Sequence, residues 1–240
     1  MQNTRAIVLR IIRYADNRVI ISFFTEHYGF ISAVVRIKHG RNCGCPASLM
    51  QLLGEVEFCI DYKASSDLQK ISNISVAMPW VDLPYNPIKA SMSIFLADFL
   101  CHALRNEGEN IALFLFLEKS LRWFDESDHG FANFHLILIL KLTRFLGIWP
   151  TLEGRSQDKI YDLKGACYSS HLPEHGQYID VEVARWIPVL LQTNYSNMHR
   201  LSFDRSKRWQ MLDILLRYYR LHVPAFGELQ SMDILRELFS

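Results

Sequence analysis

The first 80 residues alternate between apolar and polar positions with a period of two, a pattern typical of β-strands. Turn-forming stretches rich in Gly, Asn, Asp and Ser separate the apolar runs, and no long helical pattern lies between them. The pattern predicts five strands: Thr4–Tyr14, Arg18–Glu26, Phe30–Lys38, Leu52–Tyr62 and Leu68–Val76. Five short strands with one longer loop after the third favour a small closed or partly closed barrel of the OB type. Strand counting leaves an SH3-like barrel as an alternative.

The second and third predicted strands form a hairpin that ends in positive charge. His27-Tyr28-Gly29 supplies the turn, with a glycine suited to positive φ. Alternation along the third strand places two sets of side chains on opposite faces: Ala33, Val35 and Ile37 inward, and Val34, Arg36 and Lys38 outward. The strand then enters a loop that carries His39, Gly40 and Arg41, so the hairpin leads into a positively charged loop, its basic exit.

After the proline-rich stretch Met78–Pro87 the apolar period lengthens to about 3.6. Helices are predicted over Ile88–Asn106, Asn110–Phe124, Phe131–Leu146, Val181–Gln192, Asp204–His222 and Met232–Phe239. Asp180 and Ser231 are expected to cap the helices that follow them, and Pro188 to kink the fourth. Residues 151–180 are polar and irregular, with a short strand pair expected at Lys159–Leu163 and Tyr178–Ile179.

These patterns predict an α+β protein with two domains. Residues 1–80 form an N-terminal OB-fold β-barrel, expected to bind nucleic acid. Residues 81–240 form an α-helical bundle domain with an inserted loop at about 151–180.

The positive charge is local, because the formal net charge of the chain is only +1. Residues 1–41 contain seven Arg and Lys against only Asp16 and Glu26. The candidates for contacts to a nucleic-acid backbone are Arg13, Arg18, Arg36, Lys38, His39 and Arg41. The alternative is an edge whose charges face solvent and block strand-to-strand aggregation.

Aromatic residues near the same hairpin could stack on bases, as OB-folds allow. They are Tyr14, Phe24, Tyr28 and Phe30. We expect Phe24 and Phe30 to be core residues instead.

Several classes of protein are disfavoured. The apolar start is broken by Arg5, Arg10 and Arg13, unlike a secretory signal, and the longest apolar run, Leu136–Leu140, is far too short for a membrane span. Five cysteines at irregular spacing suit a reducing compartment, so a cytoplasmic location without membrane contact is expected.

No catalytic or nucleotide-binding motif supports an enzyme, and no cofactor is expected. Cys43 and Cys45 with His39 form a weak zinc candidate, because no fourth ligand is evident. Two free thiols in a loop are the favoured interpretation. Cys59 and Cys101 lie in apolar runs and are interpreted as small core residues.

Three segments together resemble the bacterial recombination mediator family RecO. Thr25, Glu26, Gly29, Gly40 and Arg41 stand where the family's N-terminal barrel has its Thr-Glu, Gly and Gly-Arg positions. The segment Arg144–Gly154, RFLGIWPTLEG, is similar to the family's Phe-Leu-Gly…Pro-x-Leu segment. The segment Tyr218–Leu235 resembles the family's C-terminal helix, linker and final helix.

The resemblance implies a DNA repair protein that binds single- and double-stranded DNA and anneals complementary strands. With RecR, such a protein helps load RecA onto strands covered by single-stranded DNA-binding protein (SSB). Lys141 and Arg144 beside an apolar helix could receive the acidic, Phe-ended tail of SSB; the alternative is a bundle helix with solvated charges. From another class, a non-enzymatic adaptor whose barrel binds protein or RNA also fits the residues.

Many RecO-like proteins carry a zinc knuckle with four cysteines after the Phe-Leu-Gly…Pro-x-Leu segment. The corresponding stretch here, Glu153–Gly176, offers only Cys167, with His171 and His175 as further ligands of N or S type. Glu174 could complete the set, but one Cys with two His and a Glu is an uncommon structural arrangement. Because a structural zinc site needs four ligands, no bound zinc is expected. We expect local packing of Ile160, Tyr161 and Leu163 against the bundle to hold the loop.

Overall fold

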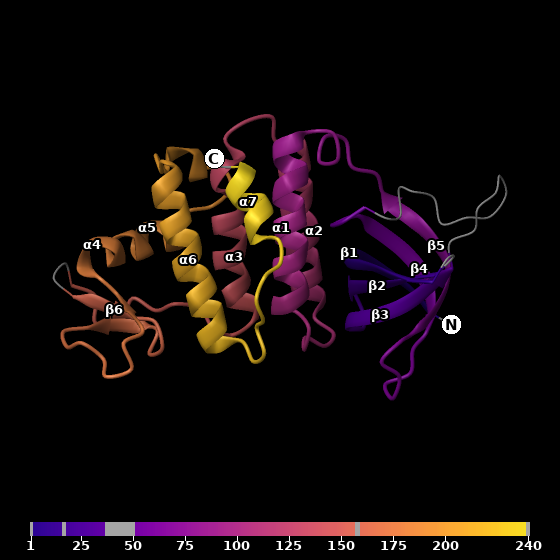
Figure 1. Ribbon diagram of the computed structural model, residues 1–240, viewed down its shortest axis with the longest axis horizontal. Helices are drawn as coiled ribbons and strands as arrows, with labels where there is room; N and C mark the ends of the chain where they lie inside the picture. Colours follow the sequence, from indigo (N-terminus) through magenta and orange to yellow (C-terminus); the bar gives the residue numbers. More distant parts are fainter. Residues whose placement is uncertain (1, 16–17, 37–50, 157–158, 239–240) are drawn as a thin grey trace. The chain divides into compact units, whose positions relative to one another are not determined.

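The computed structural model describes residues 2–15, 18–36, 51–156 and 159–238. The chain divides into two compact units, 1–126 with 228–240 and 127–227 (Figure 1). The first unit contains the N-terminal sheet with helices α1 (Pro87–Ala103), α2 (Ile111–Glu126) and α7 (Met232–Leu238). A domain boundary near residue 80 stays a prediction from the sequence.

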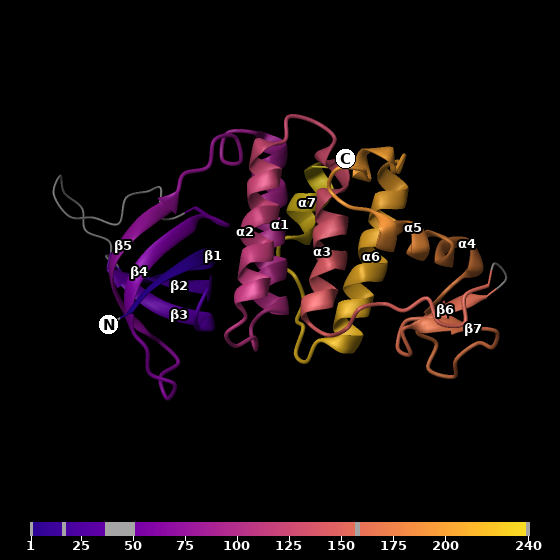
Figure 2. The same ribbon diagram turned by 180° about the vertical axis from the view of Figure 1, so that it is seen from behind.

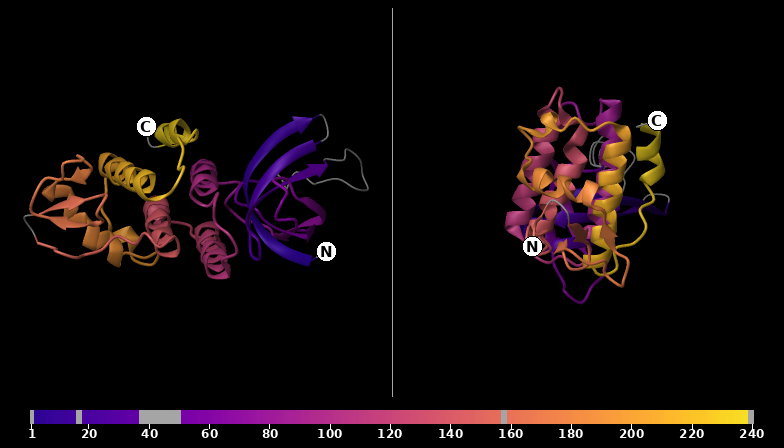
Figure 3. Two further views of the ribbon diagram at one scale, coloured as in Figure 1. Left: turned by 90° about the horizontal axis from the view of Figure 1, so that it is seen from below. Right: turned by 90° about the vertical axis from the view of Figure 1, so that its left-hand side faces the viewer.

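Five antiparallel strands form the N-terminal sheet in the order β3-β2-β1-β4-β5. They are β1 (Gln2–Ala15), β2 (Arg18–Thr25), β3 (Gly29–Arg36), β4 (Glu55–Asp61) and β5 (Lys70–Met78). The strands curve strongly, as Figure 3 shows. A parallel bridge joins Ala33 of the edge strand β3 to Gln69, the residue before the other edge strand β5, and the Gln69 N–H donates to the Ser32 carbonyl at 2.7 Å. The prediction of a closed or partly closed barrel of the OB type is confirmed.

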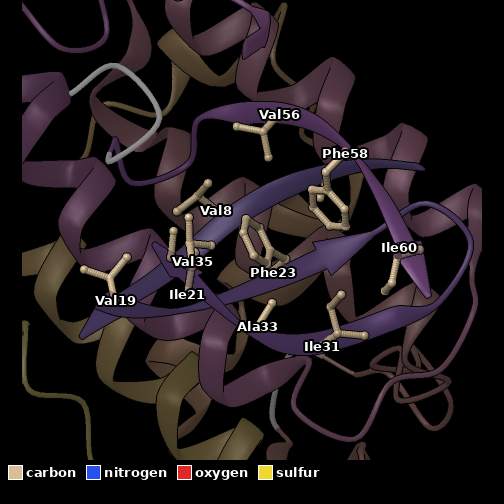
Figure 4. Packing of buried hydrophobic residues seen from close by; sticks show 11 residues of the cluster. Val8, Val19, Ile21, Phe23, Ile31, Ala33, Val35, Val56, Phe58 and Ile60 are labelled. Atoms are coloured by element: carbon tan, nitrogen blue, oxygen red, sulfur yellow. The ribbon is translucent and has the colours of Figure 1, made fainter. Parts of the chain in front are cut away.

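Apolar side chains from these strands meet inside the barrel (Figure 4). Phe23 and Phe58 have ring centroids 5.1 Å apart. Ala33 and Val35 are buried, whereas Arg36 at the end of the same strand is exposed, so the predicted alternation of β3 is correct over the described residues.

The turn between β2 and β3 depends on Gly29, whose φ is 64°. A Cβ at this position would lie 2.3 Å from the Glu107 carbonyl oxygen, in the connection between α1 and α2. The neighbouring Phe30 N–H donates to the same oxygen at 2.9 Å. Thr25 closes the turn, because its hydroxyl accepts from the Tyr28 N–H and donates to the Gly29 carbonyl. The glycine therefore permits both the turn and a close approach between two segments of the first unit.

Arg5 of β1 fastens helix α2 to the barrel through carboxylates from the β2–β3 turn, β4 and α2. Its guanidinium donates to both oxygens of Glu26 at 2.9 and 3.0 Å and to Glu118 of α2 at 2.6 Å. Glu55 of β4 lies 3.5 Å away, with its side chain nearly buried. The hydrogen bond from Arg5 lowers the pKa of Glu26, whereas burial and the adjacent Glu118 raise the pKa of Glu55. As pH rises, the two carboxyl groups therefore change the stability of the fold in opposite directions.

We predict that Glu26→Gln and Glu55→Gln differ in their pH dependence. Glu26 stabilises the fold above its usual pKa of 4.5, and this contribution is lost as pH falls. Glu55 stabilises below 4.5, and its contribution is lost as pH rises through its raised pKa. At pH 7 Glu26→Gln should cost about 2 kcal/mol and Glu55→Gln much less.

Urea unfolding at pH 4.5 and pH 7 measures both effects, with the exposed Glu126→Gln as the control. From pH 4.5 to pH 7, the free energy of unfolding of Glu55→Gln should rise relative to that of the unchanged protein. That of Glu26→Gln should fall relative to it. Equal losses for the two variants at pH 7 would contradict this assignment.

Asp125 at the end of α2 fixes the segment that leaves the barrel. Its carboxylate accepts from three consecutive backbone N–H groups, those of Val81, Asp82 and Leu83, at 2.7 to 2.9 Å. Lys89 of α1 is fully buried and donates to the Asp125 carbonyl and to the Asp82 carboxylate, each at 2.8 Å. These contacts join the barrel exit, the start of α1 and the end of α2.

Replacing Asp125 by Ala should destabilise the protein by about 3 kcal/mol, because three backbone donors lose a charged acceptor. The matched control is Glu126→Ala, which removes an exposed carboxylate from the adjacent position of the same helix. Denaturant midpoints compare the two variants. A loss for Asp125→Ala no greater than that of the control would show that the three hydrogen bonds contribute little.

The second unit combines helices with a small sheet (Figure 2). Its elements are η2 (Phe131–Asn133), α3 (Phe134–Phe145), β6 (Ile160–Asp162), β7 (Cys167–Ser169), β8 (Tyr178–Ile179), α4 (Val181–Ala184), α5 (Trp186–Gln192), η3 (Met198–Arg200) and α6 (Arg205–His222). The small sheet has the order β7-β6-β8, so a third strand, β7, joins the predicted pair.

The predicted helix Val181–Gln192 is broken at Arg185, three residues before the expected kink. Pro188 explains the position, because a proline has no N–H to donate to the carbonyl four residues earlier, that of Ala184. The Tyr168 hydroxyl donates to this carbonyl instead, at 2.9 Å. Within this described segment Asp180 precedes α4 without a side-chain capping bond, contrary to expectation. Ser231 precedes α7, but its hydroxyl donates to Asp98 of α1 at 2.8 Å.

The inserted segment packs against α6, as predicted. Tyr161 and Leu163 are buried in a cluster with Tyr218 of α6, whereas Ile160 is only half-buried. The Tyr161 hydroxyl donates to the Ala166 carbonyl at 2.7 Å, and that of Tyr218 to the Ile148 carbonyl at 2.9 Å. Among the described residues, no helix combines the length and apolarity that crossing a bilayer requires.

Candidate nucleic-acid interface

Three arginines gather at the end of the barrel where β2 begins and β3 ends. Arg18 and Arg36 are direct partners in the β2–β3 ladder. Arg13 of β1 pairs with Val19, the next residue along β2. All three side chains are exposed. Among the described residues none of them forms an ion pair with a carboxylate.

The pairing of Arg18 with Arg36 places two like charges opposite each other. Directly paired residues project from the same face with their Cβ atoms roughly 5 Å apart, and like charges in this position are destabilising. Arg13 projects from the inner face of the sheet, like its partner Val19, which is a core residue. Arg18 and Arg36 project from the outer face. The three cations therefore lie on both faces of the sheet at one end of the barrel, and we call Arg13, Arg18 and Arg36 the barrel edge. An anion near them would relieve the repulsion between Arg18 and Arg36.

The other three candidates, Lys38, His39 and Arg41, lie outside the described residues. The same applies to Cys43 and Cys45. These positions follow Arg36 directly along the chain, so the proposed basic exit of the hairpin stays a prediction for them.

The four aromatic candidates differ in exposure. Tyr14, between Arg13 and the end of β1, is 64% exposed and is free to stack on a base. Phe24 is fully buried, as expected, but Phe30 is half-buried, because it lies on the outer face of an edge strand. Tyr28 stacks on Tyr62 with ring centroids 4.8 Å apart. This pairing is not predicted by the sequence pattern, since Tyr62 comes from a separate strand run.

Comparisons with known proteins agree with this barrel and its position in the chain. The family model for the N-terminal part of recombination protein O matches residues 1–80, and that for its C-terminal part matches residues 85–230. The chain belongs to the RecO family. Over the full length of both chains it is 40% identical to the DNA repair protein RecO of Phocaeicola vulgatus. It is 36% identical to that of Bacteroides fragilis, covering 99% of that protein, and 30% identical to that of Porphyromonas gingivalis, covering 98%.

Membership of the RecO family confirms the predicted class of protein. RecO proteins are non-enzymatic recombination mediators, which agrees with a sequence that lacks catalytic motifs. The function in DNA repair and recombination is therefore established at the level of the family.

Lys141 and Arg144 lie one turn apart on α3 of this RecO chain. Burial and the nearby Arg144 lower the pKa of Lys141, and the Arg144 guanidinium lies 5.0 Å from the centre of the Trp149 ring. The apolar hollow that Leu140 and Pro150 help to line has a volume of only about 40 Å³. A phenylalanine ring would have to open this hollow before entering it. The two cations lie close together on α3, but this hollow is too small to receive the ring as it stands.

In the inserted segment of this RecO chain, the candidate metal ligand His175 makes other contacts. His175 Nε2 lies 3.4 Å from the Asp162 carboxylate, and His175 Nδ1 accepts from the Gln177 N–H at 3.1 Å. Cys167 is half-buried in β7. Within the described residues no three side chains of the types His, Cys, Asp or Glu are grouped closely enough to hold a metal ion.

We predict that protein purified without a metal-binding tag contains no stoichiometric zinc, because the segment offers too few grouped ligands. Elemental analysis of the unchanged protein and of Cys167→Ser provides the measurement. Both should fold alike and contain only traces of zinc. About one equivalent of zinc in the unchanged protein, lost in Cys167→Ser, would overturn the prediction.

Proposed function

We propose that this chain binds DNA through the barrel edge and anneals complementary strands. With RecR, it would help load RecA onto single-stranded DNA covered by SSB. The observation that carries the proposal is the direct pairing of Arg18 with Arg36, next to Arg13, without carboxylate partners among the described residues.

The phosphate groups of a nucleic-acid strand fit this arrangement of cations better than the surface of a folded acidic protein. The cations lie on both faces of a strand edge, where an extended backbone can pass them one after another. The exposed Tyr14 ring stands between Arg13 and the end of β1, where a base could stack. Neither contact reads a base edge, so binding should be independent of sequence.

In this proposal residues 1–80 act as the DNA-binding domain and residues 81–240 as the domain for partners. Lys38, His39 and Arg41 would extend the phosphate track beyond Arg36. Lys141 and Arg144 would pair with the carboxylates of the SSB tail after the adjacent apolar hollow opens. The family also implies contact with RecR, and a cytoplasmic location suits all these partners.

We predict that Arg18→Gln with Arg36→Gln weakens DNA binding equally for unrelated sequences. The slope of log affinity against log salt should become shallower by about 1.4 for single strands, since each lost phosphate contact accounts for about 0.7. Fluorescence anisotropy with labelled oligonucleotides measures both quantities, and adding Lys38→Gln and Arg41→Gln should enlarge both changes.

The matched control is Lys63→Gln with Lys70→Gln, which removes two exposed charges from another part of the same barrel. Annealing of complementary oligonucleotides coated with SSB should slow in the arginine variant and not in the control. Unchanged binding by a folded arginine variant would move the site elsewhere. Binding of the unchanged protein that hardly varies with salt would favour the adaptor function instead.

A further inference from the structure

A second cationic region lies on the unit formed by residues 127–227. From Arg185 to Gln210 the sequence contains five Arg and Lys against Asp204 alone. This excess is large for a chain whose net charge is +1. The described structure connects part of this stretch with cations of the inserted segment.

Arg155, Lys159 and Arg185 line an open hollow of about 600 Å³. Tyr168, Val181 and Pro188 line it as well. Arg155 and Arg185 are exposed and Lys159 is half-buried. Arg185 pairs with Glu182 at 2.7 Å, but both side chains are more than half exposed, so this ion pair is weak and can give way to a phosphate.

The local backbone builds the hollow from two sides. Gly154 has a φ of 68°, and a Cβ there would lie 2.9 Å from the Tyr168 carbonyl oxygen and 3.8 Å from Lys159 Nζ. The glycine thereby lets the segment before Arg155 lie against β7, beside the Lys159 ammonium. On the other side, Arg185 stands at the break between α4 and α5, which Tyr168 supports through its bond to Ala184. Figure 2 shows α4 and α5 next to the small sheet.

The positive region continues from the hollow to α6. Trp186, the residue after Arg185, packs edge-on against Phe203, with ring centroids 4.9 Å apart. Lys207 of α6 holds its ammonium 5.5 Å from the centre of the Trp186 ring. We name Arg155, Lys159, Arg185 and Lys207 the second cationic track. Its four cations come from three separate parts of the unit, with a half-buried aromatic ring between them.

We propose that the second cationic track binds the phosphate backbone of a second DNA strand. The inference rests on the proposed function, because a protein that holds two strands at once would bring them together for annealing. A series of cations beside an aromatic ring suits an extended polyanion with bases that can stack. A short acidic peptide would instead favour cations that converge on one or two carboxylates.

The test compares Arg155→Gln with Lys159→Gln, made together, and a matched control, Lys164→Gln with Arg220→Gln. The control removes the same charge from exposed positions of the same unit, at the far end of the β6–β7 hairpin and in the last turn of α6. Circular dichroism and thermal midpoints establish that both variants fold. Each protein is then given one equivalent of an unlabelled oligonucleotide, followed by a labelled, non-complementary one.

We expect the track variant to bind the first strand within about twofold of the unchanged protein. Its affinity for the second strand should fall at least about fivefold, with a salt slope shallower by about 1.4. Its annealing rate should fall in parallel, while the control keeps all three properties. The variant Arg18→Gln with Arg36→Gln should lose affinity for the first strand instead.

Three results would count against the inference, and they can be told apart. Normal second-strand binding and annealing in the track variant would overturn it and leave the proposed function standing. Normal second-strand binding together with lost binding of a labelled Asp- and Glu-rich peptide would assign the track to a protein partner. An unchanged protein that neither binds nor anneals DNA would overturn the proposed function itself.

Discussion

The position of the segment that follows β5 depends on the Asp125 carboxylate, which accepts hydrogen bonds from N–H groups that have no backbone acceptor among the described residues. Pro79, Pro84 and Pro87 interrupt the segment after β5, so it cannot continue the sheet or begin a helix early. The N–H groups of Val81, Asp82 and Leu83 therefore need acceptors, and Asp125 supplies both of its oxygens to them. The Lys89 ammonium donates to the Asp125 carbonyl, which has no partner within α2 because it lies at the end of the helix. Since α1 begins and α2 ends at this point, the helices of the first unit take their position from it.

The arginines of the barrel show how charge can be structural or functional within one sheet. Arg5 forms ion pairs with Glu26, Glu55 and Glu118, which join β1 to the β2–β3 turn, β4 and α2. Arg18 and Arg36 face each other, an arrangement that costs stability. This contrast agrees with a structural role for Arg5 and with the DNA-binding role proposed for the other two arginines.

The elements with strong periodicity could be predicted from the sequence, because their signal is local. The strands of the barrel and the long helices belong to this group, as does Gly29, whose turn demands positive φ. Contacts between distant residues could not be predicted, and the Asp125 carboxylate is 42 to 44 residues from the N–H groups it binds. The three-residue strand β7 is too short to show a period. Phe30 differs from expectation because burial of an edge strand depends on what covers its outer face, which the strand itself does not encode.

In the second unit, tyrosines stabilise the inserted segment from within. Three of them, Tyr161, Tyr168 and Tyr218, pack together, and each hydroxyl donates to a backbone carbonyl. Each ring contributes apolar burial, and each hydroxyl of these half-polar side chains finds a backbone acceptor in the segment. The bond from Tyr168 is the most consequential, because it takes the carbonyl that Pro188 frees and so permits the sharp break at Arg185. The same break places Arg185 at the edge of the cationic hollow, so the packing that holds this segment together also sets the position of a charge on its surface.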